Sequence, residues 1–278
     1  MPDAVRLPLG EGSALNRLRF KFVRGDEVKY ISHLDMMKVF ERAARRAEIP
    51  VTYSQGFNPH PQMVFGLPLS VGVTSEAEYA DFELDELMEP EEFIKRMNGS
   101  LPEGFSVIRA EVRQAKNNIM AAIAGAAYSI LVFDGKNEGI NLIREKIGGF
   151  ISKPCITVKK EGKNGVRDVD IRPMIYNIEA DLVDEPADPS KHDDREILEY
   201  VRMLSLGNFV GPRYDRENLF CLHTLLSAGS ASNLKPELLV SALNEVGGLG
   251  IKALKIHRTG LYVGKEGGLV EPLDPDVL

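Results

Sequence analysis

Tryptophan is absent from this 278-residue chain, and cysteine occurs only twice, as Cys155 and Cys221. Two cysteines exclude a disulfide scaffold, a four-cysteine zinc site and an iron–sulfur cluster held by this chain alone. Such low cysteine use is typical of the reducing cytoplasm, where we expect the protein. No apolar run approaches the roughly 18 residues of a membrane span, so we expect no membrane contact.

A positive charge excess is also lacking. The net charge is −7, from 34 Lys+Arg against 41 Asp+Glu, which argues against indiscriminate coating of nucleic acid. The charges are uneven, because residues 17–62 hold nine basic and five acidic residues, whereas residues 63–112 hold three and eleven. We therefore predict a local basic face on an acidic protein. The acidic block is more simply interpreted as solvated surface.

The length predicts about two domains. Residues 1–16 show no periodic pattern and are expected to form a flexible arm. We predict one domain over residues 17–116 and a second over 117–278. The second carries an acidic, proline-bearing segment at 182–194, which predicts an exposed loop.

Residues 17–24 alternate basic and apolar side chains, which predicts a half-buried strand. Leu18, Phe20 and Phe22 should face inward, and Arg17, Arg19 and Lys21 outward. A helix follows, with Ser32 as its N-cap and Asp35 completing a capping box, and it should end near Glu48, before Pro50. Its core-facing residues are expected to be Leu34, Met37, Phe40, Ala44 and Ala47.

The remaining patterns complete a split βαβ order in each half. In the first domain we predict strands at 51–54, 63–66, 79–84 and 105–112, and a helix at 90–97. In the second we predict strands at 128–133, 156–160, 166–181, 196–206 and 251–263, and helices at 137–148 and 236–246. The predicted fold class is α+β, with two tandem ferredoxin-like (split βαβ) domains built on antiparallel sheets.

Two blocks, Ser32-His33-Leu34-Asp35 and the SQGFNPHP segment at 54–61, resemble the uncharacterised domain family associated with radical SAM proteins. The resemblance continues through 75–79 and 169–173 and covers nearly the whole chain after residue 16. It implies a radical SAM enzyme as partner, but no reaction. Because this chain has no CxxxCxxC set, it would be the partner and not the radical enzyme.

Four basic residues of the first helix fall within about 100° of one another at 100° per residue. This basic stripe consists of Lys38, Arg42, Arg45 and Arg46. Guanidinium forks fit phosphate oxygens, so the stripe predicts phosphate contact, to which outward Arg17, Arg19 and Lys21 would add. The alternative is a solvated face in which Glu41 supports Arg45 at i,i+4.

The 54–62 loop places polar side chains among prolines, a glycine and Phe57. Rigid donors and acceptors beside an aromatic ring suit recognition of RNA bases, and the candidates are Gln55, Asn58, His60 and Gln62. A stiff structural connection with its own internal hydrogen bonds is the alternative. We predict that this loop and the basic stripe form one RNA-binding surface.

The catalytic candidates are weaker. His33 and His60 could act as general bases, or could join Asp35 around a metal, although their spacing matches no known ligand set and we predict no metal site. Asp168 and Asp170 faintly resemble the aspartate motif of some pseudouridine synthases, but an exposed strand with paired charges is the simpler interpretation.

Small polar residues at 227–233 precede a helix and could expose N–H groups to an anion, although a flexible surface loop is the simpler interpretation.

Together these features predict an RNA-associated accessory protein that works with a radical SAM enzyme, in RNA or ribosome modification, without a cofactor or an activity of its own. One alternative is an RNA-modifying or RNA-cleaving enzyme, either pseudouridine-synthase-like through Asp168 or Asp170, or a metal-independent ribonuclease using His33 or His60. Another is a protein–protein adaptor that does not bind RNA.

Overall fold

The computed structural model describes residues 16–113, 118–162, 165–183, 195–205 and 214–277. The predicted arm, apart from Asn16, lies outside the described residues. So does the predicted acidic loop, apart from its first two residues. Among the described residues, no helix combines the length and the apolar character needed to cross a membrane.

The N-terminal half follows the predicted order of elements. They are β1 (Arg17–Arg24), α1 (His33–Arg46), β2 (Met63–Phe65), β3 (Thr74–Glu83), α2 (Pro90–Asn98) and β4 (Phe105–Arg113). Ser32 is confirmed as the N-cap, because its hydroxyl accepts from the Asp35 N–H. The same hydroxyl donates to the Asp35 carboxylate, whereas a full capping box joins that carboxylate to the Ser32 N–H. The strand predicted at 51–54 is reduced to isolated bridge pairs at Val51 and Tyr53.

The C-terminal half contains more elements than predicted. They are α3 (Ile119–Ala122), β5 (Ile123–Asp134), α4 (Ile140–Ile151), β6 (Thr157–Gly162), β7 (Gly165–Asp170), β8 (Ile175–Leu182), α5 (Arg195–Ser205), β9 (Leu219–Ser227), α6 (Pro236–Glu245), β10 (Ile251–Lys265) and β11 (Gly268–Val270). The strand predicted at 196–206 is wrong, because this segment is the helix α5. Ile197, Val201 and Leu204 recur at i, i+4 and i+7, which is helical spacing.

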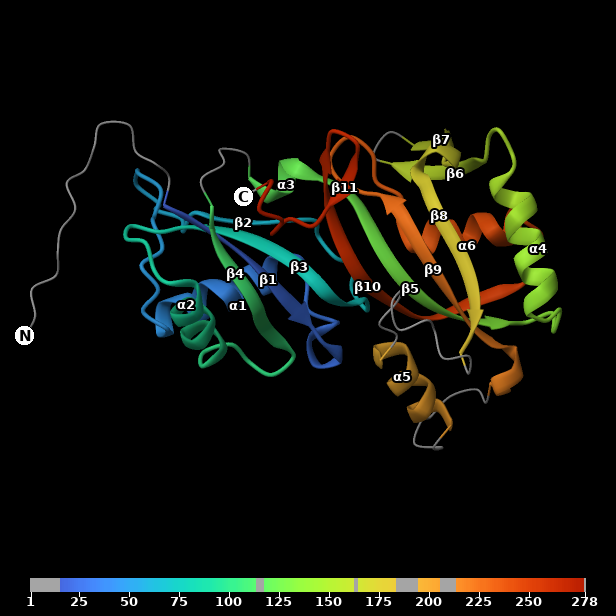
Figure 1. Ribbon diagram of the computed structural model, residues 1–278, viewed down its shortest axis with the longest axis horizontal. Coiled ribbons are helices and arrows are strands. Elements are labelled where there is room, and N and C mark those ends of the chain that lie inside the picture. Colours follow the sequence, from blue (N-terminus) through green and yellow to red (C-terminus); the bar gives the residue numbers. More distant parts are fainter. Residues whose placement is uncertain (1–15, 114–117, 163–164, 184–194, 206–213, 278) are drawn as a thin grey trace, which may run out of the picture.

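One nine-stranded sheet runs through both halves (Figure 1). Its order is β4-β1-β3-β10-β5-β9-β8, with β2 beside β3 and β11 beside β10. All neighbours are antiparallel except β3 and β10, which pair in parallel where the two halves meet. The α+β class with a mostly antiparallel sheet is therefore confirmed. The hairpin of β6 and β7 stands apart as a two-stranded sheet.

The first core lies between the N-terminal strands and two helices. Phe20 of β1 contacts both Phe40 of α1 and Phe93 of α2, and all three are fully buried. Leu18 and Phe22 are fully buried beside it, as predicted. One member of the predicted helix face is wrong: Leu34 is 69% exposed, and the buried stripe runs instead through Met36, Phe40, Ala43, Ala44 and Ala47.

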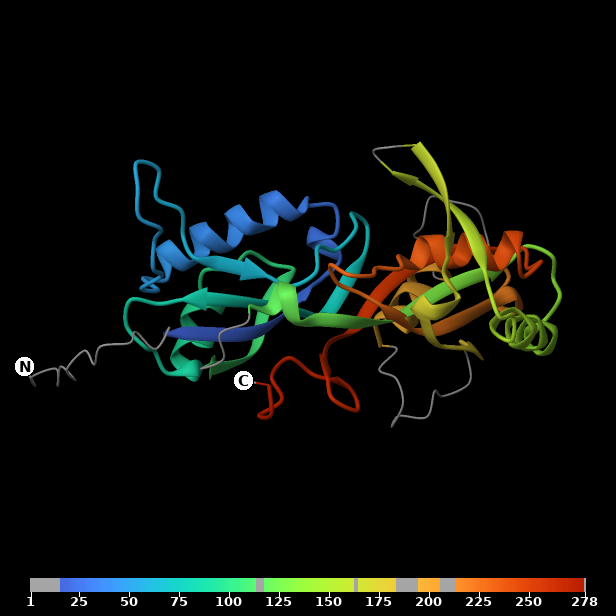
Figure 2. The same ribbon diagram turned by 90° about the horizontal axis from the view of Figure 1, so that it is seen from above.

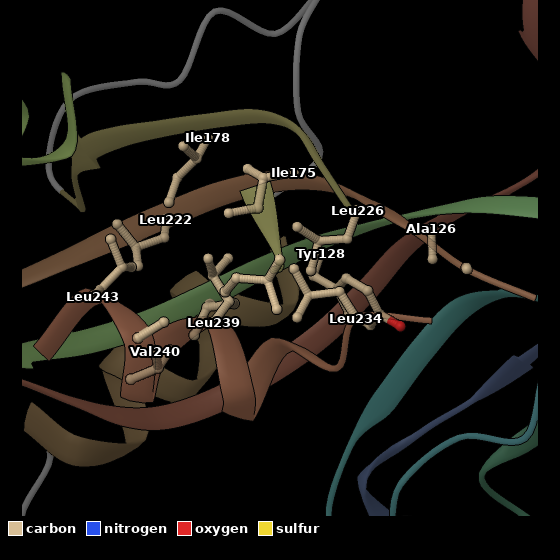
Figure 3. Close-up of a cluster of buried hydrophobic side chains, with 14 of the residues drawn as sticks. Ala126, Tyr128, Ile175, Ile178, Leu222, Leu226, Leu234, Leu239, Val240 and Leu243 are labelled. Atoms are coloured by element: carbon tan, nitrogen blue, oxygen red, sulfur yellow. The ribbon is translucent and has the colours of Figure 1, made fainter. Parts of the chain in front are cut away.

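The second core lies between the C-terminal strands and α6, which is on the same side of the sheet as α1 (Figure 2). Leu239, Val240 and Leu243 of α6 point toward strand residues such as Tyr128 and Leu222 (Figure 3). The opposite face of these strands is covered by α5, whose Ile197 and Val201 are buried in a separate apolar cluster. Both faces of this half of the sheet are therefore covered.

Buried charges join the two halves. Arg258 of β10 pairs with Glu78 of β3 at 2.8 Å and donates to the Tyr128 hydroxyl at 3.3 Å. Lys255, also on β10, pairs with Asp26 at 3.2 Å and with Glu196 of α5 at 2.7 Å. A strand of one half thus holds carboxylates from both.

Candidate nucleic-acid interface

The candidate site is a groove of about 180 Å³ between the C-terminal half of α1 and the chain that follows it. Arg45 and Glu41 line it from the helix, and Tyr53 and Pro61 line it from the connection to β2. Ala44, Ile49, Val51 and Met63 complete the lining. This groove therefore brings together one residue of the basic stripe and the base of the predicted recognition loop.

Local hydrogen bonds build the loop side of the groove. Tyr53 and Pro61 form a bridge pair, and the Ser54 N–H donates to the His60 carbonyl at 2.8 Å. The His60 N–H in turn donates to the Ser54 hydroxyl at 2.9 Å. These bonds close the 54–60 segment on itself, and it projects past the C-terminal end of α1 (Figure 2). The internal hydrogen bonds expected of a stiff structural connection, which is the alternative interpretation of this loop, are thus present.

The predicted recognition side chains lie mostly in solvent. Gln55, Asn58 and His60 are exposed, Gln62 is half-buried, and Phe57 at the tip is fully exposed. The Asn58 amide nitrogen lies 3.3 Å from the His60 ring nitrogen, so these two side chains orient each other. The loop presents an aromatic face and polar edges together.

The basic stripe only partly converges on the groove. Arg45 lines it and pairs with Glu41 at 3.0 Å, whereas Arg46 turns away and donates to the Ser100 carbonyl at 2.5 Å. Lys38 lies 3.7 Å from Asp35, and Arg42 is exposed without a partner among the described residues. Exposed ion pairs on one helix are worth little, so a phosphate could replace either carboxylate.

Of the three basic residues of β1 that were predicted to face outward, Arg17 and Arg19 are buried, so the prediction is wrong for these two. Arg19 is fully buried and donates two hydrogen bonds to Asp81, and Arg17 pairs with Glu83. Lys21 is half-buried, with its ammonium 6.0 Å from the Tyr79 ring. The cause is a second cover on this face of the sheet, where the Pro272 carbonyl accepts from Arg19 and the Ile119 N–H donates to Asp81. The Arg17 and Arg19 side chains are therefore not open to phosphate.

The catalytic candidates are not brought together. His33 begins α1 and His60 lies near its other end, so about 20 Å of helix separates them. Burial lowers the pKa of His33 despite the nearby Glu78. Among the described residues, no three His, Cys, Asp or Glu side chains form a group that could hold a metal.

The two aspartates lie on the β6–β7 hairpin, in the other half. Asp168 is exposed opposite Lys159, in line with the paired-charge interpretation. Asp170 accepts the N–H groups of Ile156 and Arg172, and these bonds lower its pKa. Both positions serve the hairpin, and neither lies at the groove.

The 227–233 segment packs against β5. The Ala228 N–H donates to the Ala124 carbonyl, and a Cβ on Gly229 would lie only 2.2 Å from the Ile123 carbonyl oxygen. A crevice beside it, lined by Asn233, Lys235 and Arg258, has about 20 Å³, which holds one water and no phosphate group.

A larger groove of about 360 Å³ lies between α4 and β8. Its cation, Arg144, donates to the Ala180 carbonyl at 2.7 Å and to Asp181 at 2.9 Å. The guanidinium is therefore engaged along the sheet edge, and this groove lacks the exposed aromatic side chains of the first.

Tyr53 and the buried Arg258–Glu78 pair were missed by the sequence reasoning. Tyr53 lies two residues before the loop candidate Gln55, between Pro50 and Gly56. An aromatic residue in such a turn-forming segment was a local signal that it belongs to the site. The pairing of Arg258 with Glu78 spans 180 positions and had no local signal.

The structure thus defines an α+β protein with one large, mostly antiparallel sheet and an exposed groove on its first helix. The chain belongs to a family described as an uncharacterized protein conserved in bacteria (DUF2344), whose model matches residues 17–236. No curated protein matches it. A crystal structure of an unknown protein from Galdieria sulphuraria is similar over 86% of this chain and 96% of its own, at 12% identity and a TM-score of 0.22.

Proposed function

We propose that the protein binds RNA at the groove beside α1 and acts as an accessory subunit in RNA or ribosome modification. The observation that carries this proposal is the groove itself, where Arg45 lies with Tyr53 and Pro61, the base of the exposed loop that bears Phe57, Asn58 and His60. Guanidinium groups supply phosphate contacts, and rigid polar edges with an aromatic ring supply base contacts.

The proposed architecture is a pair of ferredoxin-like units. In the first half the strand order is β4-β1-β3-β2. In the second it is β10-β5-β9-β8, where β5, β8, β9 and β10 are the first to fourth strands once the β6–β7 hairpin and α5 are counted as insertions. Each half therefore has the order fourth-first-third-second of the split βαβ arrangement. The domain boundary near 116 and 117 and the cytoplasmic location remain predictions. Many functions share such folds, so the architecture adds little to the functional argument.

The partner in this proposal is a radical SAM enzyme. Its support is the resemblance of the SHLD and SQGFNPHP blocks to domains associated with such enzymes. Co-purification of the chain with a radical SAM enzyme of the same genome, before and after ribonuclease treatment, tests this part. A complex that survives ribonuclease supports a direct partner, and the absence of any complex contradicts it.

The RNA part is tested by anisotropy of labelled RNA oligonucleotides over a range of salt. Arg42→Ala/Arg45→Ala should weaken binding to all sequences, and each lost contact should reduce the slope of log K against log salt by about 0.7–0.9. A further Arg46→Ala substitution should weaken RNA binding less, because the Arg46 guanidinium already donates to the Ser100 carbonyl. The matched control is Lys95→Ala/Arg96→Ala on α2, which removes the same charge elsewhere.

Asn58→Ala/His60→Ala should narrow the affinity gap between preferred and random RNA and leave the salt slope nearly unchanged. Equal affinity of all these variants and the control for RNA would contradict RNA binding at this groove.

The adaptor alternative is favoured by a different observation at the start of α1. Tyr30, Leu34 and Val71 are 74%, 69% and 58% exposed. The Gly72 N–H donates to the Lys29 carbonyl, which places Tyr30 against the Val71–Gly72 turn. Exposed apolar side chains in one neighbourhood are typical of protein contacts. For the enzyme alternative, only His60 of the named candidates lies beside the groove.

A further inference from the structure

The RNA that occupies this groove is single-stranded, we infer, with one unpaired base in the groove and another stacked on Phe57. This inference rests on the proposed function and specifies the class of RNA. Two exposed aromatic side chains support it. Phe57 is fully exposed, and Tyr53, which lines the groove, is 40% exposed.

The groove has the size and lining for one flat ring. Its volume of about 180 Å³ is smaller than the roughly 300–1,000 Å³ of pockets that enclose drug-sized ligands. Ala44, Ile49 and Val51 form a buried apolar floor. Arg45 and Tyr53 stand at its sides. An apolar floor fits a base, and Arg45, whose exposed pair with Glu41 is weak, lies at the edge where the phosphate of that base remains in solvent.

Hydrogen bonds close the two ends of the loop that carries Phe57. The Gln62 N–H donates to the Thr52 carbonyl at 2.8 Å, and two further bonds join Ser54 to His60. Because these bonds join the ends of the loop, they reduce the backbone entropy that is lost when the loop binds a ligand. A fully exposed phenylalanine on a loop closed in this way has the arrangement of a stacking platform.

A duplex cannot use these features. In A-form RNA the bases are paired and stacked inside the helix, and the edges in the deep groove are out of reach of side chains. Unpaired bases can be splayed out and stacked on aromatic rings, whatever their sequence. The salt-dependent contacts of Arg42 and Arg45 serve either form of RNA, whereas Tyr53 and Phe57 serve only the single strand.

The test compares a labelled 12-nucleotide single strand with a blunt-ended duplex of two 12-nucleotide strands, in anisotropy titrations with the full chain. Wild-type protein should bind the single strand at least about tenfold more tightly. Phe57→Ala should weaken single-strand binding roughly 5- to 150-fold without changing its salt slope. Phe57→Tyr should restore binding, and neither variant should change duplex affinity.

Tyr176→Ala is the matched control, because Tyr176 is 49% exposed on β8 in the other half and should have no effect. Because Phe57 contacts solvent only, its replacement should leave thermal unfolding unchanged, which separates loss of binding from loss of folding.

The outcomes separate the two proposals. If neither RNA binds, the proposed function fails. If both RNAs bind equally, or the duplex binds more tightly, the single-strand inference fails and RNA binding stands. The inference also fails if Phe57→Ala retains full single-strand affinity but loses co-purification with the partner enzyme, which would assign Phe57 to a protein contact.

Discussion

Arg19 and Asp81 face each other across β1 and β3 and are joined by two parallel hydrogen bonds, of 2.7 Å from Nε and 2.9 Å from Nη2. Both side chains are almost completely buried. Arg113 of β4 lies 3.4 Å from the same carboxylate, and the Ile119 N–H also donates to it. One carboxylate thus satisfies two cations and the start of α3 on the sheet face opposite α1 and α2.

Replacing Asp81 with Asn should therefore destabilise the fold severely. The substitution leaves two buried guanidinium groups without a counter-charge, and breaking a buried pair in this way costs about 3–5 kcal/mol. Urea unfolding should measure the loss as a lower midpoint. The exposed pair of Glu92 and Arg96 supplies the control, since Glu92→Gln should change the midpoint far less. Equal effects of the two substitutions would contradict a special role for Asp81.

This pair also explains where prediction from the sequence ends. The alternation in β1 correctly assigned Leu18 and Phe22 to the core, because side-chain period is a local property of a strand. It could not reveal that the C-terminal segment, more than 250 positions away at Pro272, covers the other face. Part of the basic excess of residues 17–62 is consequently not on the surface, because Arg17 and Arg19 are buried and pair with Glu83 and Asp81.

The candidate site was predicted to the extent that it is local. The 54–62 loop follows soon after α1 in the chain, so the sequence alone led us to expect the loop to lie close to Arg45. The bond from Arg46 to Ser100 could not be expected, because it depends on how α2 and β4 pack beside α1. By contrast, α5 was misassigned although a local signal was present, because Ile197, Val201 and Leu204 recur at helical spacing.

A double-substitution cycle should show that Glu78 and Arg258 act as a unit joining the two halves. Their side chains are 6% and 2% exposed. Glu78→Gln and Arg258→Met alone should each cost about 3–5 kcal/mol, because each leaves the other buried without its partner. The double variant should cost clearly less than the sum, and unfolding free energies from urea titration give the coupling. Strict additivity would show that the two residues stabilise the fold independently.

Gly229→Ala should destabilise the protein through a clash and not through φ alone. Gly229 has φ +118°, and an added Cβ would lie 2.2 Å from the Ile123 carbonyl oxygen. The control is Gly267→Ala, which also has positive φ (+94°) but meets nothing within 4 Å. The φ strain should cost about 1–3 kcal/mol in either variant, and thermal unfolding should show a further loss only at Gly229. Equal losses of thermal stability in the two variants would mean that the backbone of β5 at Ile123 shifts enough to relieve the clash.

The link from Asp26 to Lys255 should make stability depend on pH. Burial opposes ionisation of Asp26, but hydrogen bonds and charges from Lys29 and Lys255 outweigh it and lower its pKa. A carboxyl with a lowered folded pKa stabilises the protein above its unfolded pKa, near 3.8, and loses that contribution as the pH falls through the folded value. Asp26→Asn should therefore cost about 1.5–3 kcal/mol at pH 6, toward the lower end because Asp26 is one-third exposed.

The difference between wild type and Asp26→Asn should be constant from pH 6 to about 5, shrink below pH 4, and disappear once Asp26 is protonated in the folded protein. Urea unfolding at pH 6, 5, 4 and 3 measures it. In a Lys255→Met background the effect at pH 6 should be smaller, since one of the two cations that lower the pKa is gone. A difference that stays level or grows down to pH 3 would show that Asp26 stabilises the junction by packing and not by charge.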